Sequence, residues 1–183
     1  MNVSGERDFA APRATVWQVL NDPAAMAKTM PGVESFDVHD DRNWTANVKI
    51  PLGLGGLKMK VDMEKVEERE PEFAKLAIKG NGVGAMLNME TSFTLSDAGS
   101  GGTAMAWSAE VKVLGPVGSM GQRVLQPIVN QQVKHVLTAL DVQVQEAAAG
   151  GGTATHGAEE GISPASPEAY EAEPEGPTTS TED

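Results

Sequence analysis

The sequence predicts an α+β fold in which a curved antiparallel sheet of seven strands wraps around one long C-terminal helix, with two short helices after the first strand. Two observations carry this prediction. Apolar and polar residues alternate through six consecutive segments between residues 33 and 113, and helical spacing then runs from Leu114 to Glu146 with no glycine after Gly121. A third observation concerns the interior: only 4% of the residues are aromatic, so few large side chains are available to fill the space between sheet and helix.

The N-terminal segment predicts one strand followed by two short helices. Residues 1–10 alternate as a strand does, and a short helix is expected over 12–21. Asp22 followed by Pro23 is an N-cap followed by a first-turn proline, which predicts a second helix ended by the breaker at 31–32. The two helices should therefore follow the first strand almost without a loop.

The alternating region predicts six more strands, polar on the outer face and apolar on the inner one. They are expected over residues 33–40, 44–52, 57–64, 74–79, 87–95 and 105–113. This phase puts Glu90 outside, but a bulge at the glycines of 80–84 would turn it inward, where it could bind a ligand oxygen. The mixed-charge run 64–72 is interpreted as a solvated strand end.

The long helical stretch carries two apolar stripes, with Pro127 between them predicting a kink. The first stripe consists of Val117, Met120, Val124 and Ile128, and the second of Val129, Val133, Val136, Leu137, Leu140 and Val144. Both stripes are compatible with an ordinary core helix that packs on a sheet. The more specific interpretation makes the first stripe one wall of an apolar cavity, because small and flexible side chains face it from the sheet.

Charge and composition exclude several classes of function. The formal net charge is −12, and the segment after Ala147 holds eight acidic residues and no Lys or Arg, so residues 148–183 are predicted to be a disordered tail behind a domain of residues 1–147. Without a basic cluster, nucleic acid is not an expected partner. Cysteine is absent, and neither a secretory segment nor a membrane-spanning one is predicted, so we expect an intracellular protein.

Catalytic and metal-binding patterns are missing from the sequence. The three histidines, His39, His135 and His156, are scattered and show no metal-ligand spacing, and no serine-nucleophile motif occurs. Three isolated histidines in an acidic chain are typical of surface residues. We therefore predict neither catalytic residues nor a metal site.

An ordered series of short motifs gives the chain a family likeness over residues 1–146. The motifs are Phe9-Ala10-Ala11-Pro12, Val16-Trp17, Leu20-Asn21-Asp22-Pro23, Met30-Pro31-Gly32-Val33, Gly80-x-Gly82-x-Gly84, Gly102-Thr103 and Leu114-Gly115-Pro116 with Gly121. Through this series the chain resembles the CoxG family of carbon monoxide dehydrogenase accessory proteins, within the START-like, or helix-grip (SRPBCC), superfamily. The resemblance implies a helix-grip fold whose space between helix and sheet takes a hydrophobic guest.

The resemblance also implies a role. It suggests a non-catalytic accessory protein of molybdenum-containing carbon monoxide dehydrogenase that binds a respiratory quinone, menaquinone, without a covalent cofactor. Such a protein would carry the quinone between the dehydrogenase and the cytoplasmic face of the cell membrane. One alternative is a recruitment or assembly factor with no small-molecule ligand. A second is an enzyme of the cyclase or hydrolase type, which the missing polar groups disfavour.

Strand and helix phases then predict the ligand-binding residues. The expected cavity walls are Met59, Val61, Met63, Ile78, Met89, Met105, Trp107, Met120, Val124 and Ile128. The expected cavity mouth is formed by Met26, Met30, Pro31, Leu54 and Leu114. Leu52, Leu54 and Leu57, in a glycine-rich connection, are expected to touch the bilayer surface through apolar contact.

Overall fold

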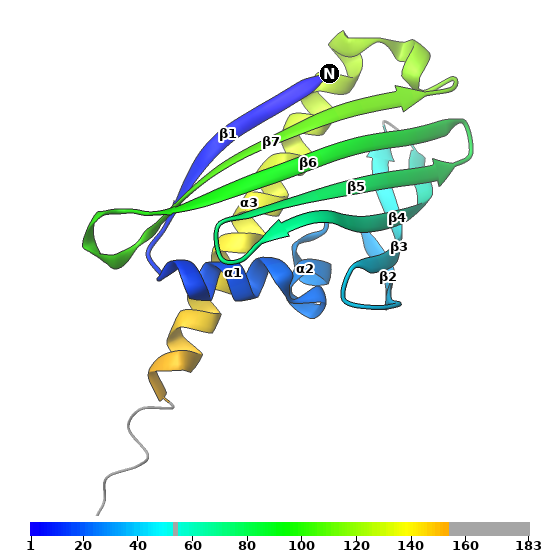
Figure 1. Ribbon diagram of the computed structural model, residues 1–183. Coiled ribbons are helices and arrows are strands. Elements are labelled where there is room, and N and C mark those ends of the chain that lie inside the picture. The colour runs from blue at the N-terminus through cyan, green and yellow to red at the C-terminus, as the bar shows by residue number, and fades with distance from the viewer. Residues whose placement is uncertain (53–54, 154–183) are drawn as a thin grey trace, which may run out of the picture.

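The computed structural model describes residues 1–52 and 55–153 (Figure 1). Its elements, in chain order, are β1 (Asn2–Phe9), α1 (Arg13–Asn21), α2 (Pro23–Thr29), β2 (Val33–Val38), β3 (Asn43–Leu52), β4 (Gly55–Arg69), β5 (Phe73–Gly82), β6 (Ala85–Asp97), the 3-10 turn η1 (Gly99–Gly101), β7 (Thr103–Leu114), the 3-10 turn η2 (Gly118–Met120) and α3 (Gln122–Thr153). The order is the predicted one, and the α+β fold class is confirmed.

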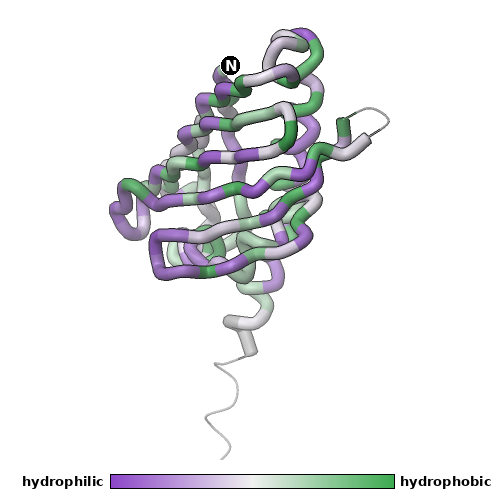
Figure 2. Tube along the Cα trace, turned by 90° about the vertical axis from the view of Figure 1, so that its right-hand side faces the viewer, coloured by the Kyte–Doolittle hydropathy of each residue, from purple (hydrophilic) through white to green (hydrophobic). Residues whose placement is uncertain are grey.

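The seven strands form one antiparallel sheet in the order β1-β7-β6-β5-β4-β3-β2. Strands β2 to β7 pair in sequence, and β1 closes the far edge by pairing with β7, so that Gly5 lies opposite Trp107. The strands pass across one side of α3, while α1 and α2 lie across one end (Figure 1). Apolar and polar residues alternate along several strands, which gives the sheet one face for the interior and one for solvent (Figure 2).

The short helices are held where the sequence predicts them. The carboxylate of Asp22 accepts a hydrogen bond from the Ala24 N–H at 2.8 Å and caps α2. Thr103, which is fully buried, donates from its hydroxyl to the Ala11 carbonyl at 2.7 Å and ties the β1–α1 junction to β7. Arg7 of β1 forms an ion pair with Asp141 of α3, which fastens the edge of the sheet to the long helix.

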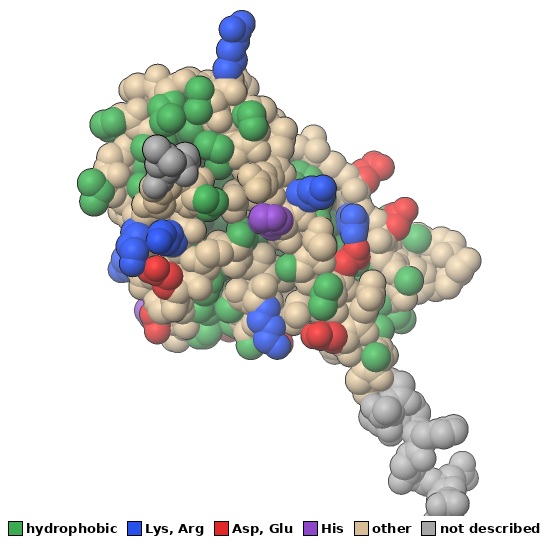
Figure 3. Space-filling model, turned by 180° about the vertical axis from the view of Figure 1, so that it is seen from behind, with side chains coloured by type: hydrophobic (Ala, Val, Ile, Leu, Met, Phe, Trp, Pro, Cys, Tyr) green, Lys and Arg blue, Asp and Glu red, His purple; other side chains and the backbone are tan. Residues whose placement is uncertain are grey.

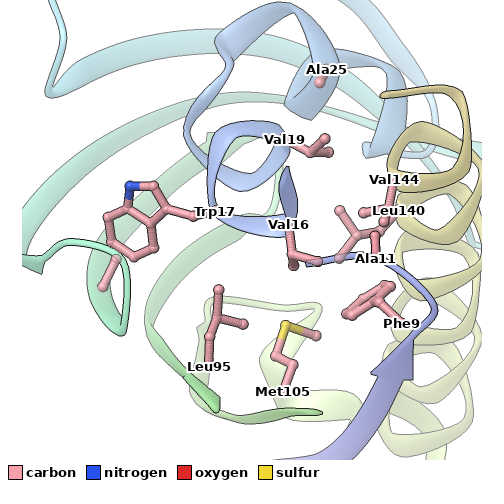
Figure 4. Packing of buried hydrophobic residues seen from close by; sticks show 11 residues of the cluster. Phe9, Ala11, Val16, Trp17, Val19, Ala25, Leu95, Met105, Leu140 and Val144 are labelled. Atoms are coloured by element: carbon pink, nitrogen blue, oxygen red, sulfur yellow. The ribbon is translucent and has the colours of Figure 1, made fainter. Parts of the chain in front are cut away.

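The buried apolar residues form two clusters. One lies under α1, where α1, β1, β6, β7 and α3 meet, and contains Val16, Trp17 and Leu140 (Figure 4). The other lies on the inner face of β3 and β4 and contains Trp44 and Met59. The inner face of the sheet continues from one cluster to the other, and the candidate site lies along it.

The predicted start and end of the long helix are wrong. Strand β7 runs to Leu114, and Gly115 and Gly121, with φ of +86° and +81°, bracket a short 3-10 turn, so α3 begins only at Gln122. Positive φ interrupts a helix, and glycine adopts it without steric cost. The helix is continuous through Pro127 and ends at Thr153, seven residues beyond the predicted end. The three alanines after Glu146 favour this extension, whereas the three glycines that follow them do not. The remainder of the predicted tail, 154–183, lies outside the described residues.

Candidate functional site

The space between the sheet and α3 holds an apolar cavity with two chambers. The first chamber, of about 360 Å³, lies among β1, β6, β7 and the middle of α3. The second chamber, of about 320 Å³, lies among α2, β3, β4 and β5. Nine residues line both: Leu20, Met26, Thr29, Ile50, Leu87, Met89, Phe93, Gln132 and Val136. The two chambers therefore adjoin along these residues.

Small and flexible residues in the wall explain why the interior is hollow. Ala85 and Ala109 face the first chamber, where larger side chains would fill it. Gly80 is buried beneath Met59, and a Cβ atom at Gly80 would come within 2.4 Å of the Met59 sulfur. Glycine at this position leaves room for the Met59 side chain against β5. Methionine can also repack around a guest because its side chain is unbranched and polarisable.

Most of the predicted wall residues line the cavity. Met59, Met89, Met105, Trp107 and Ile128 line the first chamber, and Val61, Met63, Ile78 and Met89 line the second. Of the predicted mouth, Met26 lines both chambers, while Met30 and Pro31 line the second. Leu52 and Leu57, expected at a bilayer surface, line the first chamber. Leu54 lies outside the described residues.

Three predicted residues do not line the cavity. Met120 and Val124 are 49% and 43% exposed, and Leu114 is half-exposed on the outer face of β7. The expectation for these two helix positions requires one helix that runs from Pro116, whereas Met120 belongs to η2 and Val124 to the first turn of α3. The helix wall consists of Leu125 and Ile128, most of the second apolar stripe (Val129, Val133, Val136, Leu137 and Leu140) and Gln132. Gly121 is the sequence signal that the true helix start lies later.

The polar groups of the wall are few. No histidine, aspartate or glutamate lines either chamber among the described residues, whereas Lys65 and Gln132 do. The mixed-charge run of β4 is therefore not wholly solvated, because Lys65 is 7% exposed. Within residues 1–52 and 55–153, no group of three His, Cys, Asp or Glu is arranged to hold a metal ion.

Glu90 points away from the cavity, as its strand phase predicts. Its carboxylate lies 2.9 Å from the Lys75 ammonium on the outer face of the sheet. The hydrogen bond from this ammonium to Glu90 raises the pKa of Lys75. The glycine-bulge alternative is thus wrong, since β5 and β6 pair without a shift in register from Gly82 to Phe73.

Exposed apolar side chains gather at the end of the molecule where β7 meets η2. They are Val83, Met86, Leu114, Met120 and Val124, which we call the apolar patch. Met86 and Leu114 are cross-strand partners, and the Val117 N–H donates to the Gly84 carbonyl at 3.0 Å, which joins the β5–β6 turn to the segment before η2. Hydrophobic side chains are dense at the upper end of the view from behind (Figure 3). Val113 and Val117, beside the patch in sequence, line the first chamber, so patch and cavity adjoin.

None of the described helices is long and apolar enough to cross a membrane.

Comparisons with known proteins agree with this geometry. Residues 5–145 match the model of the CoxG family, whose description is that of a carbon monoxide dehydrogenase subunit. No curated protein matches the chain. A conserved protein from Geobacillus kaustophilus is similar in structure, with a TM-score of 0.75 and 20% identity over 80% of this chain and 97% of its own.

Two further solved structures share the fold. A START superfamily protein from Mycobacterium smegmatis has a TM-score of 0.62 and 16% identity over 79% of this chain and 97% of its own. A truncated norcoclaurine synthase from Thalictrum flavum has a TM-score of 0.55 and 12% identity over 77% of this chain and 91% of its own. At these identities the similarity concerns the fold alone, which is START-like.

Proposed function

Because the chain belongs to the CoxG family of carbon monoxide dehydrogenase subunits, we propose that it binds a respiratory quinone, menaquinone, in the two-chambered cavity. In this proposal it carries the quinone between the membrane and a molybdenum-containing carbon monoxide dehydrogenase at the cytoplasmic face. The protein itself catalyses no step. Its work is to solubilise a molecule that would otherwise stay in the bilayer.

The observation that carries the proposal is the pair of adjoining apolar chambers between the sheet and α3. Burial of one methylene group is worth about 0.8 kcal/mol, so an isoprene unit of five carbons contributes roughly 4 kcal/mol. Association costs roughly 4 to 15 kcal/mol in lost freedom. Several isoprene units must therefore be buried together, which needs a long apolar cavity rather than a shallow surface groove.

The scarcity of polar groups supports a carrier over an enzyme. General acid–base catalysis needs side chains within hydrogen-bond reach of a reacting group. Among the described residues, the chambers offer no carboxylate or imidazole for that purpose. Of the described residues that line the chambers, Lys65 alone is charged.

The apolar patch supports contact with a bilayer at the end of the cavity. The net charge of −12 repels anionic lipid headgroups, so attraction must come from apolar contact. Val83, at the tip of the β5–β6 turn, is 94% exposed, and the patch adjoins the first chamber through Val113 and Val117. A quinone tail leaving the bilayer here would pass from lipid to cavity with little exposure to water.

The proposal is tested by reconstituting the transfer. Purified molybdenum carbon monoxide dehydrogenase, carbon monoxide and vesicles containing menaquinone are mixed with or without the full chain, and the menaquinol formed is measured. We expect quinol formation to rise with the concentration of the chain. If the chain binds the dehydrogenase but leaves the quinol yield unchanged, the carrier proposal fails and a recruitment or assembly factor is the better account.

A further inference from the structure

A lysine enters the cavity wall beside an irregularity in strand pairing. Along β4 the side chains of Met59, Val61 and Met63 face inward, and Lys65 is the next inward position. The register of β4 against β5 shifts between Lys65 and Glu67. A bulge of this kind changes which side chains face inward.

The shift places a lysine and a glutamate on the same inner face. Lys65 lies opposite Leu76, and after the shift Glu68 lies opposite Ala74, which is 1% exposed. The Lys65 ammonium lies 2.9 Å from the Glu68 carboxylate, and the lysine side chain is 8% exposed. The second chamber therefore has one nearly buried lysine in a mostly apolar wall, and its partner Glu68, which is 28% exposed, lies outside the lining.

A second donor lies beside this pair. The Lys65 ammonium is 5.9 Å from the centre of the Trp44 ring, and Trp44 lines the same chamber. Trp44 is 8% exposed, and its indole N–H is buried with no hydrogen-bond partner among the described residues. An ammonium group has three donors, and Glu68 takes one. Buried donors without partners are uncommon and call for an explanation.

Charge balance selects the kind of oxygen that could meet these donors. Lys65 and Glu68 together carry no net charge. A carboxylate bound beside them would leave one uncompensated negative charge in an apolar chamber, which is costly. A neutral carbonyl oxygen accepts a hydrogen bond without disturbing the balance. The pair therefore suits a ketone-type acceptor better than a fatty-acid headgroup.

We propose that Lys65 donates a hydrogen bond to one carbonyl of the quinone ring, so that the ring lies in the second chamber and the tail extends into the first. This inference rests on the function proposed above and assigns the orientation of the ligand. From Lys65 to Leu57, which lines the first chamber, β4 spans eight residues, or about 26 Å at about 3.3 Å per residue. The cavity is thus long enough for a ring at one end and several isoprene units beyond it.

The test compares Lys65→Met with Lys60→Met, a control on the outer face of the same strand, where the side chain is 60% exposed. Affinities of the full chain for a short-tailed menaquinone and for squalene, an isoprenoid without oxygen, are measured by displacement of a fluorescent apolar dye. A hydrogen bond to a charged group is worth roughly ten- to hundredfold in affinity. We expect Lys65→Met to lower the affinity for menaquinone by at least about tenfold and to leave the affinity for squalene unchanged. Lys60→Met should leave both affinities unchanged.

Two additions keep the test decisive. Because Lys65→Met leaves Glu68 without its partner, the double variant with Glu68→Gln is measured in parallel and should show the same selective loss. Infrared spectra of bound menaquinone should show one carbonyl band shifted to lower frequency in the wild-type chain, and the shift should vanish in both variants.

The outcomes separate this inference from the proposed function. Equal menaquinone affinity in Lys65→Met and wild type, or unshifted carbonyl bands, would overturn the orientation and leave the carrier role standing. If Lys65→Met lowers the affinity for a fatty acid, measured in the same assay, but not the affinity for menaquinone, the orientation is also overturned, in favour of an anionic ligand. A wild-type chain that binds neither menaquinone nor squalene would refute the proposed function itself.

Discussion

Filling the first chamber should abolish ligand binding without unfolding the protein. Ala109 faces this chamber from β7, between β1 and β6. In Ala109→Phe, the added ring would occupy roughly the 150 Å³ that accommodates a benzene molecule, or about two-fifths of the chamber volume of about 360 Å³. The remaining space cannot hold a tail that extends through both chambers.

The expected magnitude follows from linkage between binding and folding. A ligand present at a hundred times its Kd stabilises the folded state by about 2.7 kcal/mol. For a domain of this size, 1 kcal/mol shifts Tm by about 2 to 4 °C, so a short-tailed menaquinone should raise the wild-type Tm by about 5 to 11 °C. In Ala109→Phe we expect a shift of less than about 1 °C at the same ligand concentration.

The matched control is Ala106→Phe, at an exposed position on the outer face of the same strand. It should keep the full ligand-induced shift in differential scanning fluorimetry. The ligand-free Tm of both variants is read in the same experiment and reports whether each still folds. A folded Ala109→Phe that retains the wild-type shift would show that the ligand does not occupy the first chamber.

Two further predictions concern the scaffold and the surface. Thr103→Val removes the hydroxyl that donates to the buried Ala11 carbonyl and should lower the free energy of unfolding by about 1 to 3 kcal/mol in urea titrations. Thr94→Val, at an exposed position, is the control. An equal loss of stability in the control would refute the stabilising role of this hydrogen bond. Met120→Asp, in the apolar patch, should reduce the amount of protein that sediments with neutral lipid vesicles at least severalfold, because a carboxylate would lose hydration on entering the apolar contact with lipid. Val142→Asp, at a position of similar exposure on α3, should not, and equal losses in the two variants would count against the patch as the contact surface.

The sequence was most informative where side-chain periodicity was unambiguous. In β4 the alternation of Met59, Val61 and Met63 with charged residues predicted the inner face correctly, since a strand has only two faces. Asp22 and Pro23 likewise placed the start of α2, because the cap is a local interaction within three residues. Such features do not depend on distant parts of the chain.

The errors arose where two kinds of local structure compete for the same residues. The segment 115–121 has helical spacing of apolar residues, but Gly115 and Gly121 adopt positive φ and confine it to a 3-10 turn. Met120 was therefore predicted to face the cavity and is half-exposed instead. An apolar spacing pattern cannot distinguish a continuous helix from a turn followed by a helix, whereas Gly121 could have done so.

Lys65 was missed for a different reason. The alternation of Met59, Val61 and Met63 puts Lys65 at the next inward position, but mixed charges usually mark a solvated surface. The register shift that follows brings Glu68 to the same face of the sheet, and Trp44 from β3 lies beside the Lys65 ammonium. A bulge is a property of two paired strands, and periodicity within a single strand does not encode it.

The measurement that tests the central claim most directly is the identification of the ligand that the protein carries. The full chain is purified without detergent from a host that makes menaquinone, extracted with organic solvent and analysed by mass spectrometry beside Ala109→Phe and Ala106→Phe. We expect close to one isoprenoid quinone per chain in the wild type and in Ala106→Phe, and none in Ala109→Phe. A wild-type protein that holds no lipophilic molecule, or whose bound molecule is equally present in Ala109→Phe, would contradict the assignment of this cavity to a carried quinone.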